Sequence, residues 1–153
     1  MLRFASSGEG STNHLTAALF QMLTKTRTVH VPYKGGGPAL NDLLAGQVAY
    51  MFGGISGLAP HAQTGKVRIL GVSSAKRSAS APEIPTVAEG GLPGYSTNTW
   101  NSLVAPRGTP AAIATRLNAE VNVVMNLPEV KDRLKKQGID PEPGTQAQLL
   151  AHV

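Results

Sequence analysis

Residues 6–15, SSGEGSTNHL, and residues 29–40, VHVPYKGGGPAL, decide the fold of this 153-residue chain. In each stretch, a glycine-rich turn follows a short apolar segment and is itself followed by the start of a helical pattern. Two such turns in one small domain place main-chain N–H groups and helix N-termini along one edge of a sheet. That arrangement binds a small anion without a metal ion or a catalytic triad. The two stretches therefore predict a binding protein for carboxylates rather than an enzyme.

The first half of the chain alternates short apolar segments with helical patterns. Strands are predicted at residues 2–5, 28–31, 48–52 and 67–72. Helices are predicted at residues 11–24, with Ser11 as the N-cap, at about 38–46, and at 56–65, with Ser56 as the N-cap. This alternation predicts an α/β fold with a mainly parallel sheet and helices on both faces. Ligands of such sheets bind at the carboxyl ends of the strands, where both glycine-rich turns fall.

The second half of the chain has a different pattern. Residues 75–98 are rich in proline, glycine and serine and predict a long loop with one helical turn at 86–89. The elements expected after this loop are a strand at 99–104, a helix capped by Thr109, a helix that begins at Pro128, and a last helix with a capping box between Thr145 and Gln148.

Composition excludes several classes of protein. The chain has no cysteine, so disulfides and thiolate metal sites are not available to it. The net charge is +5, but the basic residues are scattered, and three Phe, three Tyr and one Trp are too few for a base-stacking platform. We therefore expect no nucleic-acid partner, and we interpret the charge as a weak field that attracts small anions.

The motifs also argue against nucleotide, metal and catalytic chemistry. A dinucleotide-binding fingerprint needs a third glycine at position 13, where this chain has Asn13. A P-loop needs a lysine after its glycines, but Lys34 comes before the three glycines of its turn, so this turn is not a P-loop. His30, His61 and His152 have no metal-ligand spacing, so we expect no metal and no cofactor. The sequence contains no motif that would identify a serine–histidine–aspartate triad. It also contains no pair of carboxylates whose placement indicates acid–base catalysis.

The turn after the first strand is the predicted ligand site. Ser11 and Thr12, with the N–H groups of the first helical turn, are expected to hold a carboxylate. Gly53 and Gly54 follow another strand and are either a further wall of the pocket or simply flexible. The alternative to a ligand site is that the turn at Ser11 and Thr12 only connects a strand to a helix. For Lys34, the alternative to a ligand contact is a charge exposed to solvent.

Four longer stretches carry a resemblance to a known family. They read FASSGEGSTNHLTAALF (4–20), VHVPYKGGGPALNDLLAGQVAYMF (29–52), GKVRILGVSSAKRSASAPEIPTVAEGGLPGY (65–95) and NTWNSLVAPRGTPAAIATRLNAEV (98–121). Over nearly its whole length the chain resembles the substrate-binding receptors of tripartite tricarboxylate transporters, also called Bug-type receptors.

The resemblance implies a periplasmic, non-enzymatic receptor of the Venus flytrap type, whose two α/β lobes close on a small di- or tricarboxylate and deliver it to a membrane permease. It implies that residues 1–97 are the second lobe, and that residues 98–153 are the return strand and helices that complete the first lobe. The ligand-facing turn of the family matches Ser7, Gly10, Ser11 and Thr12, and the segment that re-enters the first lobe begins at Thr99.

Other expectations follow from the same resemblance. The chain shows no signal peptide, and both of its ends are expected to be cuts in a longer receptor. The face left by the missing lobe is an expected self-association surface and would support a homodimer. Two alternatives to a working receptor stay open, namely an anion-sensing or regulatory module of the same fold and an inactive truncated fragment.

Overall fold

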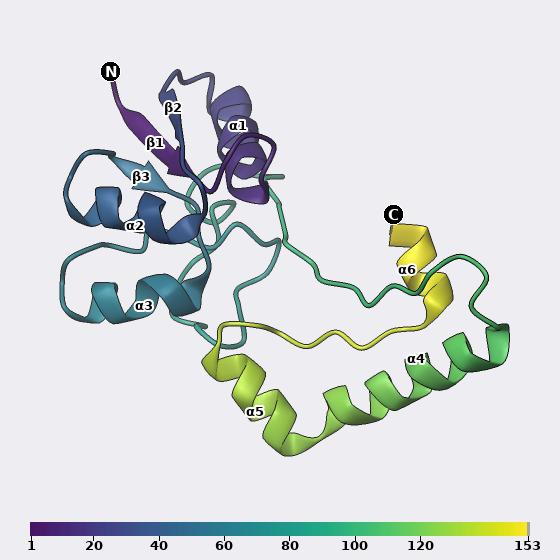
Figure 1. The fold of residues 1–153 in the computed structure, drawn as a ribbon. Coiled ribbons are helices and arrows are strands. Elements are labelled where there is room, and N and C mark those ends of the chain that lie inside the picture. The colour runs from purple at the N-terminus through teal and green to yellow at the C-terminus, as the bar shows by residue number, and fades with distance from the viewer. Residues whose placement is uncertain (153) are drawn as a thin grey trace. The chain divides into compact units, whose positions relative to one another are not determined.

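The structure, a computed structural model, describes residues 1–152 (Figure 1). The chain divides into two compact units, Met1–Thr99 and the segment from Trp100 onward. Each unit is described by itself. Within the described residues, no helix combines the length and the apolar character that crossing a bilayer requires.

The first unit is built on a parallel sheet. Its strands are β1 (Arg3–Ser6), β2 (Val29–Pro32) and β3 (Tyr50–Met51), and its helices are α1 (Thr12–Thr24), α2 (Gly36–Leu44) and α3 (Ile55–Gln63). The 3-stranded sheet has the order β2-β1-β3, with both neighbours parallel to the central β1 (Figure 1). The predicted α/β fold is therefore confirmed, with the chain crossing over β1 between its second and third strands.

Successive residues of β1 face opposite sides of the sheet, and each side is covered by a different helix. Phe4 stacks on the ring of His14 from α1, with ring centroids 6.3 Å apart. Ala5 is fully buried on the other side in a cluster with Ala39 of α2. The helices α1 and α2 thus lie on opposite faces, as two right-handed crossovers running in opposite directions require.

The loop that follows α3 packs back onto α1 through one tyrosine. Tyr95 is 1% exposed, and its hydroxyl donates to the carbonyl oxygen of Thr16 over 3.0 Å. The ring of Tyr95 lies 6.1 Å from that of Phe20 and 6.3 Å from that of Phe52, measured between centroids. Burial of this ring fixes a segment that has little regular structure of its own.

The second unit contains α4 (Ala111–Asn126), α5 (Pro128–Lys136) and α6 (Gln146–His152). Asn118 and Asn122 of α4 both donate to the carbonyl oxygen of Gly144, at 2.9 and 3.0 Å, which ties α4 to the segment before α6. The predicted capping box is confirmed: Thr145 N–H donates to Gln148 Oε1, and Gln148 N–H donates to Thr145 Oγ1.

Two predicted strands are absent from the described residues. Between residues 67 and 72 only Val72 makes a ladder contact, an isolated parallel bridge to Thr86, and residues 99–104 form no ladder at all. Both segments carry apolar side chains that remain on the surface, and Leu70 is 74% exposed. An apolar run predicts a segment that can be buried, but a strand also needs a partner for its main-chain hydrogen bonds.

Two predicted helix caps are also wrong. The N-cap of α3 is Gly54, and Ser56 lies inside the helix. The N-cap of α4 is Pro110, while the hydroxyl of Thr109 donates to the carbonyl oxygen of Pro106 instead. By contrast, Ser11 caps α1 as expected, because its side chain accepts from the N–H of His14.

Candidate ligand-binding site

The two glycine-rich turns are joined to each other by main-chain hydrogen bonds. The N–H of Tyr33 donates to Ser6 O, and that of Gly35 donates to Ser7 O, both over 3.1 Å. Gly8 has φ +137°, and a Cβ added there would lie 3.4 Å from Tyr33 O. Glycine is therefore required where the second turn passes close to the first. The expected meeting of the two turns at one edge of the sheet is confirmed.

Ser11 and Thr12 have different hydrogen-bonding roles at the start of α1. The Ser11 hydroxyl donates to Gly8 O over 2.7 Å and accepts from His14 N–H, so its bonds are used within the turn. Thr12 is exposed, and neither its hydroxyl nor its main-chain N–H has a hydrogen-bond partner within residues 1–152. Thr12 is therefore the better candidate of the two to donate to a ligand.

Asn13 connects the first turn with the end of β3. Its Oδ1 accepts from the Ser7 hydroxyl over 2.9 Å, and its Nδ2 donates to Phe52 O over 2.5 Å. This bridge holds the N-terminus of α1 beside the residues that enter α3. Asn13 was missed as a site residue, although its place in the first turn of the helix, next to Ser11 and Thr12, was visible in the sequence.

A hollow of about 390 Å³ lies beside Asn13. Its walls come from the first turns of α1, α2 and α3 and from the end of β3, and the residues that line it are Asn13, Gly36, Gly37, Leu40, Met51, Gly53, Gly54, Ser56, Gly57 and Leu58. Three helix N-termini therefore border one hollow, and each places unpaired N–H groups and a partial positive charge at its end. No titratable side chain is among the lining residues.

The predicted site residues are distributed unevenly around this hollow. Gly53 and Gly54 line it, and Ser7 reaches it through Asn13. Gly10, Ser11 and Thr12 form the adjoining turn without lining the hollow, and Thr99 is an exposed residue at the end of the first unit. Gly36 and Gly37 also line the hollow but were not predicted as site residues, although they belong to the glycine-rich run that follows Lys34. A binding role for all of these residues stays a prediction.

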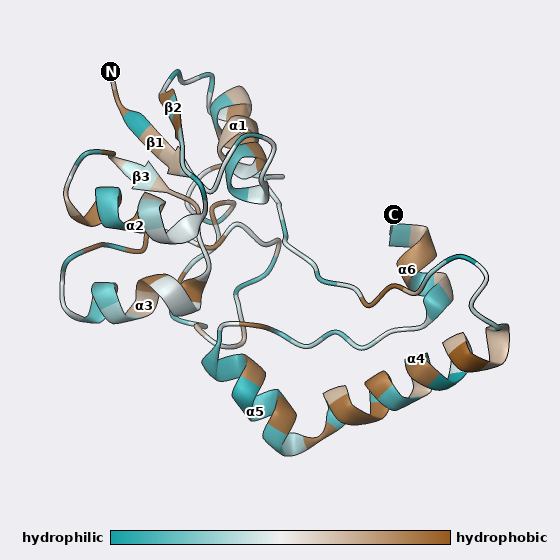
Figure 2. Ribbon diagram, in the orientation of Figure 1, coloured by the Kyte–Doolittle hydropathy of each residue, from teal (hydrophilic) through white to brown (hydrophobic). Residues whose placement is uncertain are grey.

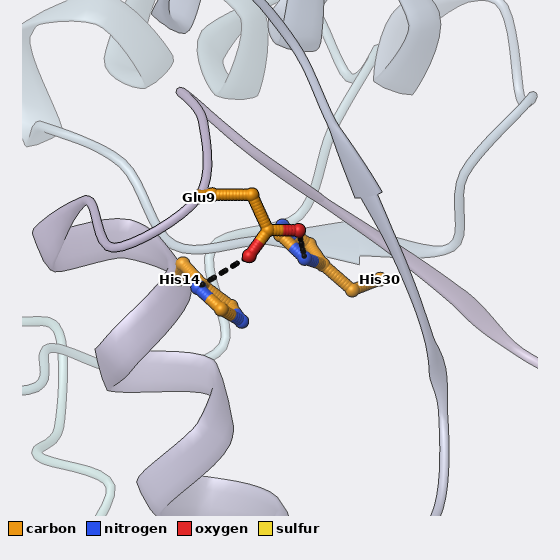
Figure 3. A group of neighbouring side chains, drawn as sticks. All are labelled: Glu9, His14 and His30. Carbon is orange, nitrogen blue, oxygen red and sulfur yellow. Dashed lines mark ion pairs between the residues drawn. The ribbon is translucent and has the colours of Figure 1, made fainter.

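Glu9, His14 and His30 form a second cluster at the same turn (Figure 3). The two imidazole rings are stacked with centroids 4.0 Å apart and planes 5° apart. Burial of His30, together with the neighbouring His14, lowers the pKa of the His30 imidazole below its usual value. The pairing of His14 with His30 was not predicted, because the spacing of His30 was compared only with that of His61 and His152.

A tyrosine–aspartate contact holds the second turn on α2. The Tyr33 hydroxyl donates to Asp42 Oδ2 over 2.6 Å. This hydrogen bond to a carboxylate raises the pKa of the Tyr33 hydroxyl, because the phenol loses its bond on ionisation. Lys34, which follows Tyr33 in the turn, is exposed.

The fold is an α/β domain with a hollow at the carboxyl ends of parallel strands, which is where proteins of this class bind their ligands. All 153 residues match the model of the family described as "Tripartite tricarboxylate transporter family receptor". The chain belongs to this receptor family.

Relatives and solved structures agree with that assignment. The chain is 42% identical over 144 residues to the "UPF0065 protein in tcbD-tcbE intergenic region" of Pseudomonas sp. (strain P51), which covers 94% of this chain and 43% of the relative. It superposes with a TM-score of 0.90 on the structure "R. palustris Rpa4515 with adipate", at 36% identity, over 99% of this chain and 50% of the other.

Two further structures have the same fold. They are "MatC (Rpa3494) from Rhodopseudomonas palustris with bound malate", with a TM-score of 0.81, 36% identity, and coverage of 99% and 53%, and the "periplasmic binding protein BugD", with a TM-score of 0.76, 31% identity, and coverage of 90% and 46%. The chain thus spans about half the length of the proteins it matches. Its fold is the α/β fold of periplasmic binding proteins, in part.

Proposed function

We propose that this chain is the ligand-holding part of an extracytoplasmic solute-binding receptor. It captures a small organic di- or tricarboxylate for a tripartite tricarboxylate-type transporter and does not transform it. The observation that carries this proposal is the hollow bordered by the first turns of α1, α2 and α3. Helix N-termini bind carboxylates through main-chain N–H groups, and here three of them meet.

The size and lining of the hollow support a small ligand and argue against catalysis. A volume of about 390 Å³ suits a small molecule. The lining combines glycines, apolar side chains, one amide and one hydroxyl, so it offers no group that could act as a general acid or base. Two of the similar structures contain adipate and malate, both of them dicarboxylates, which supports the same ligand class for this chain.

The partners and location belong to the same proposal. We expect the receptor to act in the periplasm and to pass its ligand to membrane permease subunits. The family description, which names a transporter receptor, and the similar periplasmic binding protein BugD support this expectation. We also expect copies of the chain to form a homodimer through exposed apolar surface. One such surface is on α4, where Figure 2 shows apolar residues along the helix and where Ile113, Leu117, Val121 and Val124 are 36–51% exposed. Light scattering after size-exclusion chromatography measures the expected dimer.

The central test is calorimetric titration of the purified chain with adipate, malate, succinate, citrate and phosphate at fixed ionic strength. One or more carboxylates should bind saturably with one site per chain, and phosphate should not. No turnover of the bound carboxylate should be detected over hours. Absence of binding by every carboxylate, or equal binding of phosphate, would contradict the proposal.

A pair of variants separates binding from folding. Thr12 lies in the turn that adjoins the hollow, next to Asn13 in its wall, and we expect its hydroxyl to donate to a carboxylate bound there. Thr12→Val removes this exposed hydroxyl, which has no partner in residues 1–152, so it should weaken carboxylate binding at least tenfold without lowering the melting temperature. Ser11→Ala removes a helix cap and should instead destabilise the fold by about 1 kcal/mol. If Thr12→Val binds as tightly as the unaltered chain, the carboxylate does not contact this turn.

A further inference from the structure

Glu9, His14 and His30 come from three successive parts of the β1-α1-β2 unit. Glu9 lies in the turn after β1, His14 in the first turn of α1, and His30 in the middle of β2. Glu9 Oε2 is 3.8 Å from His14 Nδ1, and Glu9 Oε1 is 3.4 Å from His30 Nδ1 (Figure 3). One ligand atom from each residue lies within 4.8 Å of the other two. The fold itself therefore assembles this donor set.

The hydrogen bonds around the two imidazoles make His14 Nδ1 an acceptor and give His30 Nε2 a hydroxyl partner. Gly10 N–H donates to His14 Nδ1 over 3.1 Å, so this nitrogen carries no proton. Ser6 Oγ lies 3.1 Å from Gly8 O and Gly8 N and 2.6 Å from His30 Nε2, so it can accept a hydrogen bond from this nitrogen. When Nε2 carries the proton, the lone pair of His30 Nδ1 faces Glu9 and is available to a metal ion.

In that tautomer, two nitrogen lone pairs and a carboxylate lie close together, and a cation among them removes their mutual repulsion. Imidazole and carboxylate together are typical ligands of Zn²⁺ and neighbouring transition metals, whereas Mg²⁺ and Ca²⁺ prefer oxygen ligands. The Ser6 hydroxyl supplies the outer hydrogen bond that metal-binding histidines usually make with their second nitrogen.

The cluster combines fixed imidazoles with an adaptable carboxylate. The side chain of His30 is 16% exposed and that of His14 is 23% exposed, while Glu9 is 75% exposed. His30 also stacks on Phe4, with centroids 4.8 Å apart. Ligands of a tetrahedral zinc ion stand about 3.4 Å apart, so small movements of Glu9 and His14 bring the three donors into range.

Ligation has a structural cost at His14. The two rings are nearly parallel, so their lone pairs do not converge on one point, and the His14 ring must turn about its Cβ–Cγ bond. That rotation breaks the hydrogen bond from Gly10 N–H to His14 Nδ1. Gly10 lies on an exposed turn, so its N–H can donate to water instead. A metal–imidazole bond is much stronger than the hydrogen bond it replaces.

We propose that Glu9, His14 and His30 form a binding site for one divalent transition-metal ion of the zinc class, with the remaining coordination position open to solvent. The bound ion would link the β1-α1 turn to α1 and β2 and so stiffen that turn. This site is separate from the proposed carboxylate hollow, which none of the three residues lines.

The test is calorimetric titration of EDTA-treated, tag-free chain with Zn²⁺ at about pH 7.5, which is above the usual pKa of an imidazole in water. One ion per chain should bind, and Co²⁺ in its place should give the visible absorption of a tetrahedral complex. Glu9→Gln and His14→Gln should each weaken Zn²⁺ binding at least tenfold. Mg²⁺ should not bind at the same concentration.

The control is His61→Gln, which alters a histidine outside the cluster and should leave Zn²⁺ affinity unchanged. Glu9 is exposed, so Glu9→Gln is expected to fold, and circular dichroism checks this. Absence of saturable Zn²⁺ binding, or equal affinity in Glu9→Gln and the unaltered chain, would overturn the proposal. So would a loss of binding in His61→Gln. Titration with adipate in EDTA measures the carboxylate function independently of these outcomes.

Discussion

Gly10 and Gly57 provide a matched pair for testing what glycine does in this fold. A Cβ added at either position would meet nothing within 4 Å, but Gly10 has φ +70° whereas Gly57 is helical. Gly10→Ala should therefore lower the free energy of unfolding by about 1–2 kcal/mol through backbone strain alone. Gly57→Ala should raise it by up to about 1 kcal/mol, because alanine favours a helix.

Urea unfolding followed by circular dichroism measures both changes in the free energy of unfolding. The opposite signs are the informative result, since loss of space cannot produce them. If both substitutions destabilise the chain equally, the β1-α1 turn does not require the left-handed conformation at Gly10.

Asn13 is expected to stabilise the junction of the first turn with β3. Asn13→Ala removes the acceptor of the Ser7 hydroxyl and the donor to Phe52 O, so it should lower the free energy of unfolding by about 1–2 kcal/mol. Asn41→Ala, at an exposed position on α2, is the matched control and should change stability by less than about 0.5 kcal/mol. Thermal unfolding of both variants makes the comparison, and equal melting temperatures would show that the Asn13 bridge contributes nothing.

At the scale of elements, the turn from Thr86 to Glu89 is stabilised by a reciprocal cap. Thr86 N–H donates to Glu89 Oε2 over 2.7 Å, Glu89 N–H donates to Thr86 Oγ1 over 3.0 Å, and the Arg77 guanidinium contacts the same carboxylate. The helical turn predicted here is confirmed by the bond from Gly90 N–H to Thr86 O. The Thr86 N–H, and then Arg77, lower the pKa of the Glu89 carboxyl.

This lowered pKa predicts a pH-dependent stability. Because the pKa of Glu89 is lower in the folded chain, the stabilisation is present above the usual glutamate pKa and is lost as the pH falls through the folded-state pKa. Glu89→Gln should therefore lower the melting temperature more at about pH 7 than at about pH 3. Glu83→Gln, at an exposed glutamate of the same loop, should show no such difference. If Glu89→Gln lowers the melting temperature equally at both pH values, the charge of Glu89 does not contribute to the stability of the fold.

The elements that could be predicted from sequence are those whose signals are local. Ser11 at the start of α1, Pro128 at the start of α5 and the Thr145–Gln148 box all act within one turn of helix, and all three are found. The segments 67–72 and 99–104 were predicted as strands from their apolar character. Strand formation depends on a partner elsewhere in the chain, which the local pattern does not specify.

The candidate site shows the same division between local and distant information. The sequence placed glycine-rich turns at strand ends, and this followed from the order of strands and helices. The sequence did not show that Asn13 would bond to Phe52 O, or that His14 and His30 would stack. The two residues of each pair are far apart in the sequence, and they meet only because the strands of the sheet lie side by side. Residues that meet through the register of parallel strands have no fixed spacing in the sequence.

At the scale of the whole molecule, the division into two compact units predicts where a protease cuts first. Residues 98–108 are exposed and lie in neither a helix nor a strand, and Arg107 lies within them. Trypsin should therefore cleave first after Arg107, because a protease needs an extended segment that can enter its active site without unfolding a domain. Within the first unit, the Lys76–Arg77 sites are held by the bond from Ser74 Oγ to Lys76 O and by the Arg77–Glu89 pair.

Limited trypsin digestion with mass spectrometry makes this measurement. The expected first product is a fragment of residues 1–107, which contains the whole first unit and its hollow. Arg107→Gln should delay the first cut, while Arg116→Gln, within α4, should leave its rate unchanged. Early cleavage after Lys25 or Arg27 instead would show that the exposed loop between α1 and β2 is cut more readily than the segment between the units. That cut would fall between Asn13 and Gly36, which both line the hollow, so no intact fragment of residues 1–107 would accumulate.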